Sequence, residues 1–306
     1  MSQKFIPMQR RNFLRNTGLT LASLAFLNKE SLAAFLSDPT WKIKMLTDDI
    51  GIFSEKGGTI GFLLSKTGTV VIDAQFPETA PHLIEEIKKK TDKPFNFLIN
   101  THHHGDHTAG NIAFKGLVGH VVAHENSKAN QERVAKEQKK EDVQLYPDMT
   151  YDAKGWMQEA DKEKIQTYYF GPGHTDGDSI IHFQHANIVH MGDLVFNRRH
   201  PFIDKTAGAS VSNWIKLLNK TTSTFDKNTQ YICGHAGPGY DVILKAEDLK
   251  AYGSYLENLL KFVGAEIKAG KTKEDILKAT EIPGSPEWKD GDITRPINAS
   301  YQELNS

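Results

Sequence analysis

The chain has 306 residues, of which 39% are hydrophobic, so it is long enough for one large core and at most two domains. Its formal net charge is −1 and it has no long Lys/Arg run, which argues against nucleic acid as a partner. The single cysteine, Cys233, excludes an intrachain disulfide and a zinc site built from cysteines.

The N-terminal residues have the layout of a signal peptide. A basic stretch that includes Arg10 and Arg11 precedes a short apolar run over 19–27, and small residues follow within 31–33. The apolar run is too short to span a bilayer. The letters R-R-N-F-L also resemble the twin-arginine pattern that the bacterial Tat exporter reads. We therefore expect residues 1–33 to be a Tat-like signal peptide; the alternative is a disordered or amphipathic N-terminus that is retained. The mature protein is expected to be periplasmic or secreted, without a stable membrane anchor.

The first half of the remaining chain alternates strand and helix patterns. Pro77 is expected to open a helix whose last turn holds lysines, and its stripe of Leu83, Ile84 and Ile87 is amphipathic. The expected elements are two strands within 59–74, a helix over 77–90, strands over 95–100 and 117–124, and a solvated helix over 125–141.

The second half continues the alternation. The expected elements are strands over 164–170, 179–184 and 187–193, a helix over 210–223, a short strand over 230–234 and a long amphipathic helix over 246–270. Strands that alternate with helices favour an α/β protein. We expect residues 41–306 to form a single domain with a helical C-terminal part.

Four histidines and an aspartate crowd the stretch T-H-H-H-G-D-H that follows the strand over 95–100. Strand-like alternation aims His102 and His104 the same way, and a turn at Gly105 then presents Asp106 and His107. Clustered imidazoles stop repelling one another once they are deprotonated and bound to a cation. The stretch therefore predicts a site for divalent metal ions. His103, between the two aligned histidines, is expected to support the loop.

Three further residues of metal-ligand type follow expected strands. His174 lies in G-P-G-H-T, Asp193 in H-M-G-D-L and His235 in C-G-H-A-G, and a glycine beside each lets the backbone approach a buried ion. Seven side chains from four loops are enough for two adjacent metal sites. Cys233 is expected to be a small core residue.

In this combination and order the chain resembles the metallo-β-lactamase fold superfamily across residues 43–240. The motifs are H-x-H-x-D-H at 102–107, P-G-H-T at 172–175, G-D at 192–193 and G-H at 234–235. The resemblance implies an αββα sandwich with metals at one edge, between the two sheets.

The resemblance also implies seven metal ligands in two sets that share one carboxylate. They are His102, His104 and His174 for one metal, Asp106, His107 and His235 for the second, and Asp193 as the bridge. The expected cofactor is two zinc ions per chain, with iron or manganese as alternatives. Asp106 is expected to act in catalysis as well, by orienting the nucleophile and relaying its proton.

Two ions that share a carboxylate lower the pKa of a bridging water from about 15.7 to roughly 7, which supplies hydroxide at neutral pH. The first hypothesis is therefore an exported dinuclear zinc hydrolase that cleaves an ester, lactone, thioester or amide bond of a small molecule. β-Lactamases of this fold usually carry Cys or Ser where Asp193 stands, so β-lactamase activity is an alternative. Asp193 resembles instead the hydroxyacylglutathione hydrolase, lactonase and phosphodiesterase branches.

A mono-iron sulfur (persulfide) dioxygenase of the same fold is the other enzymatic alternative. It uses fewer of these ligands, so the full set of seven favours two metals. The intact set also disfavours a binding protein with a vestigial site. The segment with Arg198, Arg199 and His200 follows Asp193 closely, and it is expected either to meet an anionic substrate or to form a solvated loop.

Overall fold

The structure is a computed structural model, and it describes residues 40–305. Residues Trp41–Ser306 form one structural unit. The expected signal peptide over residues 1–33 lies outside the described residues and stays a prediction. Within residues 40–305, no helix is both long and apolar enough to cross a membrane.

The first sheet has seven strands in the order β1-β2-β3-β4-β5-β6-β7. Its first four strands pair antiparallel, and β4 to β7 then pair parallel. Their bounds are β1 Lys42–Met45, β2 Ile50–Ser54, β3 Ile60–Leu64, β4 Thr69–Ile72, β5 Phe95–Ile99, β6 Val118–His124 and β7 Met149–Tyr151.

The second sheet has six strands in the order β15-β13-β11-β10-β9-β8, and a short parallel pair, β12 with β14, lies apart from it. The strands are β8 Met157–Ala160, β9 Glu163–Tyr168, β10 Ile180–Phe183, β11 Ile188–His190, β12 Phe196–Asn197, β13 Gln230–Ile232, β14 His235–Ala236 and β15 Ile243–Leu244.

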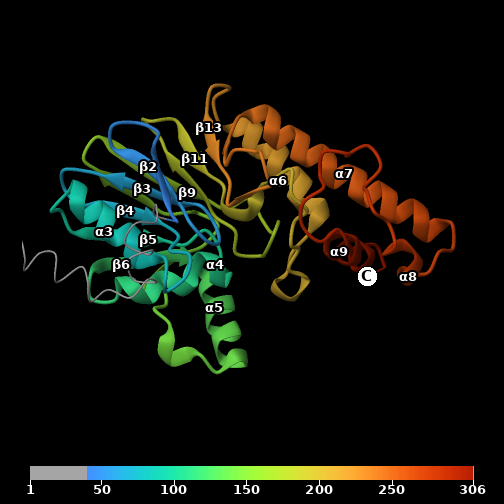
Figure 1. The fold of residues 1–306 in the computed structure, drawn as a ribbon, viewed down its shortest axis with the longest axis horizontal. Coiled ribbons are helices and arrows are strands. Elements are labelled where there is room, and N and C mark those ends of the chain that lie inside the picture. The colour runs from blue at the N-terminus through green and yellow to red at the C-terminus, as the bar shows by residue number, and fades with distance from the viewer. Residues whose placement is uncertain (1–39, 306) are drawn as a thin grey trace, which may run out of the picture. The chain divides into compact units, whose positions relative to one another are not determined.

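Helices cover the outer faces of both sheets, with α3 on the first and α6 and α7 on the second (Figure 1). The α-helices are α3 Ala80–Lys90, α4 Gly105–Thr108, α5 Glu125–Gln138, α6 Val211–Thr224, α7 Ala246–Lys268, α8 Lys273–Ile276 and α9 Thr294–Leu304. Short 3₁₀ turns cover Ala109–Phe114, Glu141–Val143, Gly192–Leu194 and Lys205–Ala207. This arrangement is an αββα sandwich, which confirms the expected fold class.

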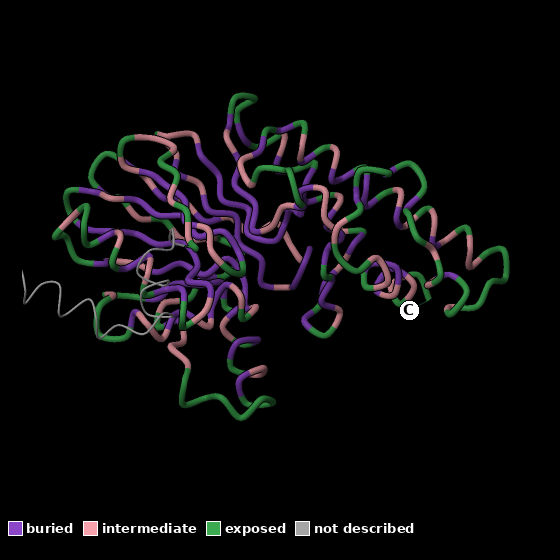
Figure 2. The backbone as a smooth tube through the Cα atoms, in the orientation of Figure 1, coloured by how far each residue is buried: buried purple, intermediate pink, exposed green. Residues whose placement is uncertain are grey.

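Side-chain alternation along the strands explains the four layers. In β4, Val70 and Ile72 join the core between the sheets, and Val71 joins the core under α3. In β10, Ile181 faces the core between the sheets and Ile180 faces the core under α6 and α7. Central strands are therefore buried on both faces, as the purple strands of Figure 2 show.

Two expected helices differ from the structure. Pro77 does not open α3: the segment before Ala80 is a turn in which Thr79 N–H donates to Phe76 O, and Pro81 occupies the first turn instead. Helix α5 is less solvated than its polar sequence predicts, because Asn130 is buried and donates to the Asp176 side chain.

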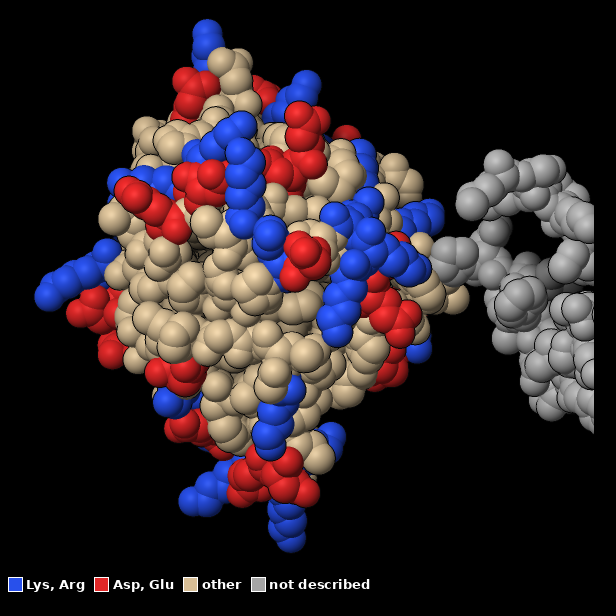
Figure 3. Space-filling view, turned by 90° about the vertical axis from the view of Figure 1, so that its left-hand side faces the viewer, with Lys and Arg blue, Asp and Glu red and all other residues tan. Residues whose placement is uncertain are grey.

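The face of the sandwich away from the C-terminal helices carries mixed charge. Figure 3 shows Lys and Arg side chains interspersed with Asp and Glu around a centre of other residues. The metal-type residues lie elsewhere, at the edge of the sandwich where the segments after β5, β9, β11 and β13 meet. Loops at the carboxyl ends of strands are the usual ligand-binding edge of α/β sheets.

Candidate metal centre

The loop after β5 turns as the sequence predicts. His104 is extended, with φ −65° and ψ 147°, and α4 begins at Gly105, so that Asp106 and His107 leave the loop in a new direction. A single short segment thereby supplies side chains to two neighbouring groups.

The first group combines three histidines from two loops with Asp193 from a third. His102, His104, His174 and Asp193 each offer one ligand atom, all within 4.8 Å of one another. Nδ1 of His104 lies 3.1 Å from Nε2 of His102 and 2.8 Å from Nε2 of His174. Three imidazole nitrogens thus converge on one point, where a divalent cation could replace their mutual contacts.

The second group consists of Asp106, His107 and His235, whose ligand atoms also lie within 4.8 Å of one another. His235 Nε2 lies 3.0 Å from Asp106 Oδ2, and His107 Nε2 lies 3.7 Å from the same oxygen. His235 begins the short strand β14, which two residues separate from the end of β13. Gly234 before it leaves no room for a Cβ because the Asp193 carboxylate lies there.

Asp193 lies between the two groups. Its Oδ1 is 3.0 Å from His107 Nε2, and its Oδ2 is 3.5 Å from His174 Nε2 and 3.4 Å from His235 Nε2. This is the position that a bridging carboxylate requires. The structure therefore brings together all seven residues that the sequence predicts as ligands, and their metal binding stays a prediction.

Two buried atoms in this cluster show that its donor set suits a cation. His107 Nε2 and Asp193 Oδ1 are buried without a hydrogen-bond partner, although they lie 3.0 Å apart. Buried polar atoms without partners are rare and need an explanation. Imidazole nitrogens and carboxylate oxygens are the ligands that zinc takes in proteins, so the cluster fits the implied metal ions.

The protonation of the histidines follows their surroundings. Burial lowers the pKa of His102, and it lowers the pKa of His174 to about 3, so both rings are neutral, as ligands must be. Burial also disfavours charge on His235, but the Asp193 carboxylate and a hydrogen bond to Asp106 outweigh it and raise its pKa to about 9. A proton on His235 thus occupies the place of a cation, and cation binding would release it.

In four of the five clustered histidines, the ring nitrogen that points away from the cluster lies within hydrogen-bond distance of an oxygen. The contacts are His102 Nδ1 to Thr101 Oγ1 at 3.0 Å, His104 Nε2 to Asp204 Oδ2 at 2.9 Å, His107 Nδ1 to Asp73 Oδ2 at 2.8 Å, and His174 Nδ1 to Phe202 O at 2.7 Å. A carboxylate or carbonyl oxygen only accepts, so His104, His107 and His174 must donate through these nitrogens. The Thr101 hydroxyl donates its proton to Asp73, so it accepts from His102. In a neutral ring, the other nitrogen faces the cluster and keeps a lone pair that can bind a cation.

Asp73 and Asp204 are functional candidates that sequence reasoning missed. Asp73 follows β4 directly and, beyond His107, accepts hydrogen bonds from the backbone and hydroxyl of Thr101, each at 2.8 Å. Its φ of 65° is unusual for a buried non-glycine residue and is typical of strained functional positions. The strand-end rule that identified Asp193 also applies to Asp73, whereas nothing in the sequence marks Asp204.

Asp73→Ala is expected to weaken zinc binding by about 10- to 100-fold, because it frees the His107 ring to rotate and change tautomer. Competition with a chromogenic chelator measures this affinity. The matched control is Asp148→Ala, since Asp148 also contacts a histidine, His120, at 2.7 Å, but both side chains are half exposed and outside the cluster. Equal zinc affinity in the Asp73 variant and the wild type would show that Asp73 does not support the site.

The other histidines and the cysteine lie outside the two groups. His103 is buried, with Nε2 3.5 Å from Asp204 Oδ2, so it contacts the loop that supports His104. His190 is buried and its Nε2 lies 3.0 Å from Thr59 O. Cys233 belongs to the core under α6 and α7.

A cavity of about 510 Å³ opens onto the cluster and is lined by His104, Asp106, His174, Asp193 and His235 among others. Arg199 and His200 also line this cavity. This position agrees with the expectation that their segment faces the substrate, and not with a fully solvated loop. Arg198 does not line it: its Nε donates to Glu287 at 2.9 Å and its guanidinium lies 4.8 Å from the Trp288 ring.

Comparison with known proteins identifies the family. The model of the metallo-beta-lactamase superfamily matches residues 55–250, so the chain belongs to this superfamily. The matched region contains both groups of candidate ligands. The relatives of this chain within the superfamily are metal-dependent hydrolases. The two His/Asp clusters of this chain agree with that class.

Similar sequences include two proteins named "Metallo-beta-lactamase type 2". The protein from Bacillus sp. (strain 170) is 23% identical over 211 residues, which cover 65% of this chain and 78% of that protein. The protein from Elizabethkingia meningoseptica is 25% identical over 207 residues, which cover 64% of this chain and 79% of that protein.

Solved structures share the fold. A metallo-beta-lactamase from Pontibacter korlensis superposes with a TM-score of 0.60 at 22% identity, covering 71% of this chain and 99% of its own. A double mutant of the sec-alkyl sulfatase PisA1 superposes with a TM-score of 0.66 at 13% identity. That match covers 86% of this chain and 50% of the sulfatase chain.

Proposed function

We propose that this protein is an exported dinuclear zinc hydrolase that cleaves an ester, lactone, thioester or amide bond in a small molecule. The observation that supports this proposal most is the position of Asp193 between two groups of three ligand-type residues each. A site for a single ion would leave one of these groups without a role.

The seven residues would hold two zinc ions, with Asp193 in contact with both. When bound, the ions would lower the pKa of a water to about 7 and polarise the substrate carbonyl. Among the candidate ligands, Asp106 has the most exposed side chain, at 30%, and it lines the cavity. Burial opposes its ionisation, but the charge of His107 and the hydrogen bond from His235 lower its pKa to about 2. Its carboxylate is therefore ionised and suited to bind a cation and to accept a hydrogen bond from a water in the cavity. The role that we propose for it in relaying that water's proton rests on its position in the cavity, not on its basicity.

A hydrolysis screen tests the proposed activity. Purified protein would be assayed with esters, lactones, thioesters, amides and β-lactams as prepared, after dialysis against a chelator, and after zinc is returned. We expect turnover of at least one of the first four classes, lost with the chelator and regained with zinc. Activity that survives complete metal removal, or no hydrolysis by the zinc-loaded protein, would contradict the proposal.

The screen also tests the two alternatives. β-Lactamase activity is supported by the names of the similar sequences, and Asp193 in place of Cys or Ser disfavours it. A persulfide dioxygenase would contain one iron and would consume oxygen. The presence of two ligand groups favours the hydrolase over this alternative.

The export proposal rests on the sequence of residues 1–33. We expect the mature protein in the periplasmic fraction of its bacterial host, shortened at its N-terminus, with export abolished when Arg10 and Arg11 are both replaced by lysine. Cell fractionation followed by N-terminal sequencing measures both points. A full-length protein that stays in the cytosol would overturn the proposal.

A further inference from the structure

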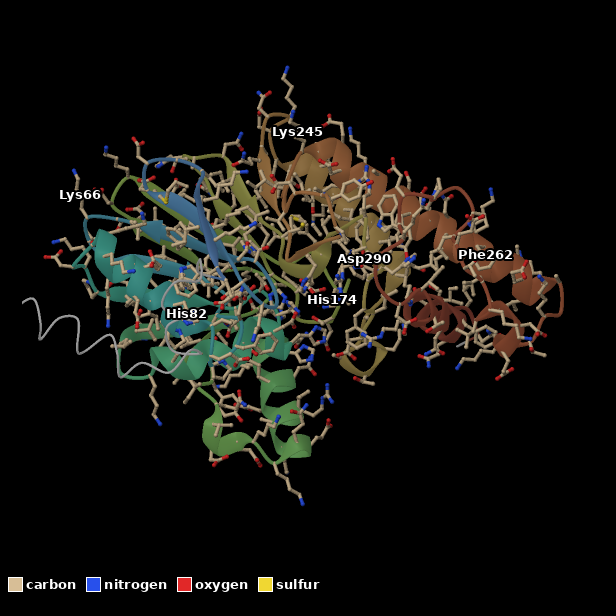
Figure 4. The ribbon with its side chains drawn as sticks, in the orientation of Figure 1. Lys66, His82, His174, Lys245, Phe262 and Asp290 are labelled. Atoms are coloured by element: carbon tan, nitrogen blue, oxygen red, sulfur yellow. The ribbon has the colours of Figure 1, made fainter. Side chains whose placement is uncertain are left out.

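One wall of the active-site cavity is built by the C-terminal segment, beyond the region that the family model matches. The match ends at residue 250, whereas Gly291, Asp292 and Arg295 line the cavity. Figure 4 shows Asp290 of this segment and the candidate ligand His174 close to the junction between the strands and the C-terminal helices. The C-terminal segment therefore helps to shape the space next to the candidate metal centre.

This wall is fixed to the loop that follows β12. Asp290 accepts a hydrogen bond from Arg199 Nη1 at 2.6 Å, and its backbone oxygen accepts one from His200 N at 2.8 Å. Trp288 stacks on Tyr255 of α7 with ring centroids 4.9 Å apart. The segment that leads into Arg295 is thus anchored to the rest of the protein before a substrate arrives.

Arg295 is the cationic side chain of this wall that lines the cavity. Its Nε lies 3.6 Å from Asp292 Oδ2, and its side chain donates no hydrogen bond to any residue within 40–305. Asp292 instead accepts two hydrogen bonds at Oδ1 from Thr294, one from the backbone and one from the hydroxyl. The Arg295 side chain is 62% exposed, so its planar fork of N–H donors remains available to a ligand.

An exposed aromatic ring connects Arg295 to the candidate metal centre. The Arg295 guanidinium lies 5.8 Å from the centroid of the Phe202 ring, and that ring lies 5.3 Å from the ring of His104. Phe202 is 42% exposed and lines the same cavity. A ligand that extends from the metal centre toward Arg295 would therefore pass an apolar surface and end at a cation.

The charge of the cavity lining favours an anion. Outside the candidate ligands, two arginines and one carboxylate line the cavity: Arg295, Asp292 and Arg199, which is paired with Asp290 outside the lining. Two divalent cations would add four positive charges beside the two carboxylates of Asp106 and Asp193. A negatively charged substrate would therefore be attracted to this cavity, and a guanidinium recognises a carboxylate in a bidentate manner.

We propose that Arg295 binds a carboxylate group of the substrate and that Phe202 packs against the apolar part next to it. This inference rests on the proposed hydrolase function. Arg295 acts in substrate selection, not in bond cleavage, so its loss should change substrate affinity with little effect on the chemical step.

A pair of matched esters tests this selection: 4-acetoxybenzoate, which carries a carboxylate, and its methyl ester, which does not. In the Arg295→Gln variant we expect KM for the carboxylate to rise by about 10-fold, the size of one lost charge-assisted contact. The kcat values and the KM for the methyl ester should stay within a factor of two or so. Arg295→Lys should keep part of the affinity that Arg295→Gln loses, because lysine keeps the positive charge but lacks the planar guanidinium that can bind a carboxylate through two hydrogen bonds.

The control is Lys278→Gln, which removes one positive charge from the same C-terminal region at a side chain that is 75% exposed and paired with Asp275. It should leave both KM values unchanged and thereby exclude a general electrostatic effect. Unchanged KM for the carboxylate in Arg295→Gln, or an equal rise for both esters, would overturn the inference.

A binding measurement separates this inference from the proposed function. Calorimetric titration with 4-hydroxybenzoate and with its methyl ester needs no turnover. Stronger binding of the carboxylate that is lost in Arg295→Gln would support the inference, even if neither acetoxy ester is cleaved. If both esters are cleaved but carboxylate binding does not depend on Arg295, the hydrolase proposal stands and the inference fails. A wild-type protein that binds the carboxylate no better than the methyl ester also contradicts the inference.

Discussion

Asp193→Ala is expected to lower the zinc content from about two ions to about one per chain and to lower kcat by a factor on the order of 10² to 10³, the equivalent of several kcal/mol of transition-state stabilisation. The reason is geometric: the Asp193 carboxylate contacts both ligand groups, with Oδ1 3.0 Å from His107 Nε2 and Oδ2 3.5 Å from His174 Nε2. Its removal also leaves a buried histidine cluster without its compensating negative charge.

Zinc content and kcat measured on the same preparation test this prediction. The control is Asp241→Ala, since Asp241 has a 56% exposed side chain and pairs with Lys44 at 3.3 Å on the surface. Circular dichroism would establish that both variants are folded. Two zinc ions and undiminished kcat in the Asp193 variant would show that this carboxylate does not bridge the two groups.

Asp106→Asn is expected to lower kcat by about 10²- to 10⁴-fold, the usual contribution of a positioned general base, while KM changes little. Asparagine keeps an oxygen that can contact a cation, but it cannot accept a proton near neutral pH. Asp241→Asn is the matched control, because it makes the same chemical change at an exposed site. An unchanged kcat in Asp106→Asn would remove Asp106 from the catalytic step and leave it only a ligand role.

The candidate ligands were predictable because each has a local signal in the sequence. His102 and His104 follow the apolar strand β5, and Asp193 and His235 follow β11 and β13 with a glycine before each. Strand ends gather at one edge of a sandwich, so residues far apart in sequence meet there without any detailed knowledge of packing.

The groups that surround the ligands could not be predicted in the same way. Asp204 contacts His104 although they are 100 positions apart in the sequence. No spacing or flanking residue in the sequence predicts this contact. Phe202 supports His174 through its backbone oxygen, which any residue possesses. Arg295 lies on α9, which packs against α7. The sequence predicted a helical C-terminal part but no particular helix beyond residue 270.

The ends of some predicted strands differ from the structure, and one edge strand was not predicted. The strand expected over 187–193 ends at His190, because Gly192 has a φ of 50° and turns the chain so that Asp193 enters the cluster. The edge strand β1 was missed because most of its residues are exposed and lack a buried alternation.

Elemental analysis of the purified mature protein tests the two-ion centre most directly. About two zinc ions per chain are expected, one for each group of three ligands with Asp193 shared between them. About one iron per chain and no zinc would contradict the dinuclear centre and would favour the dioxygenase, whose assay is oxygen uptake with a persulfide.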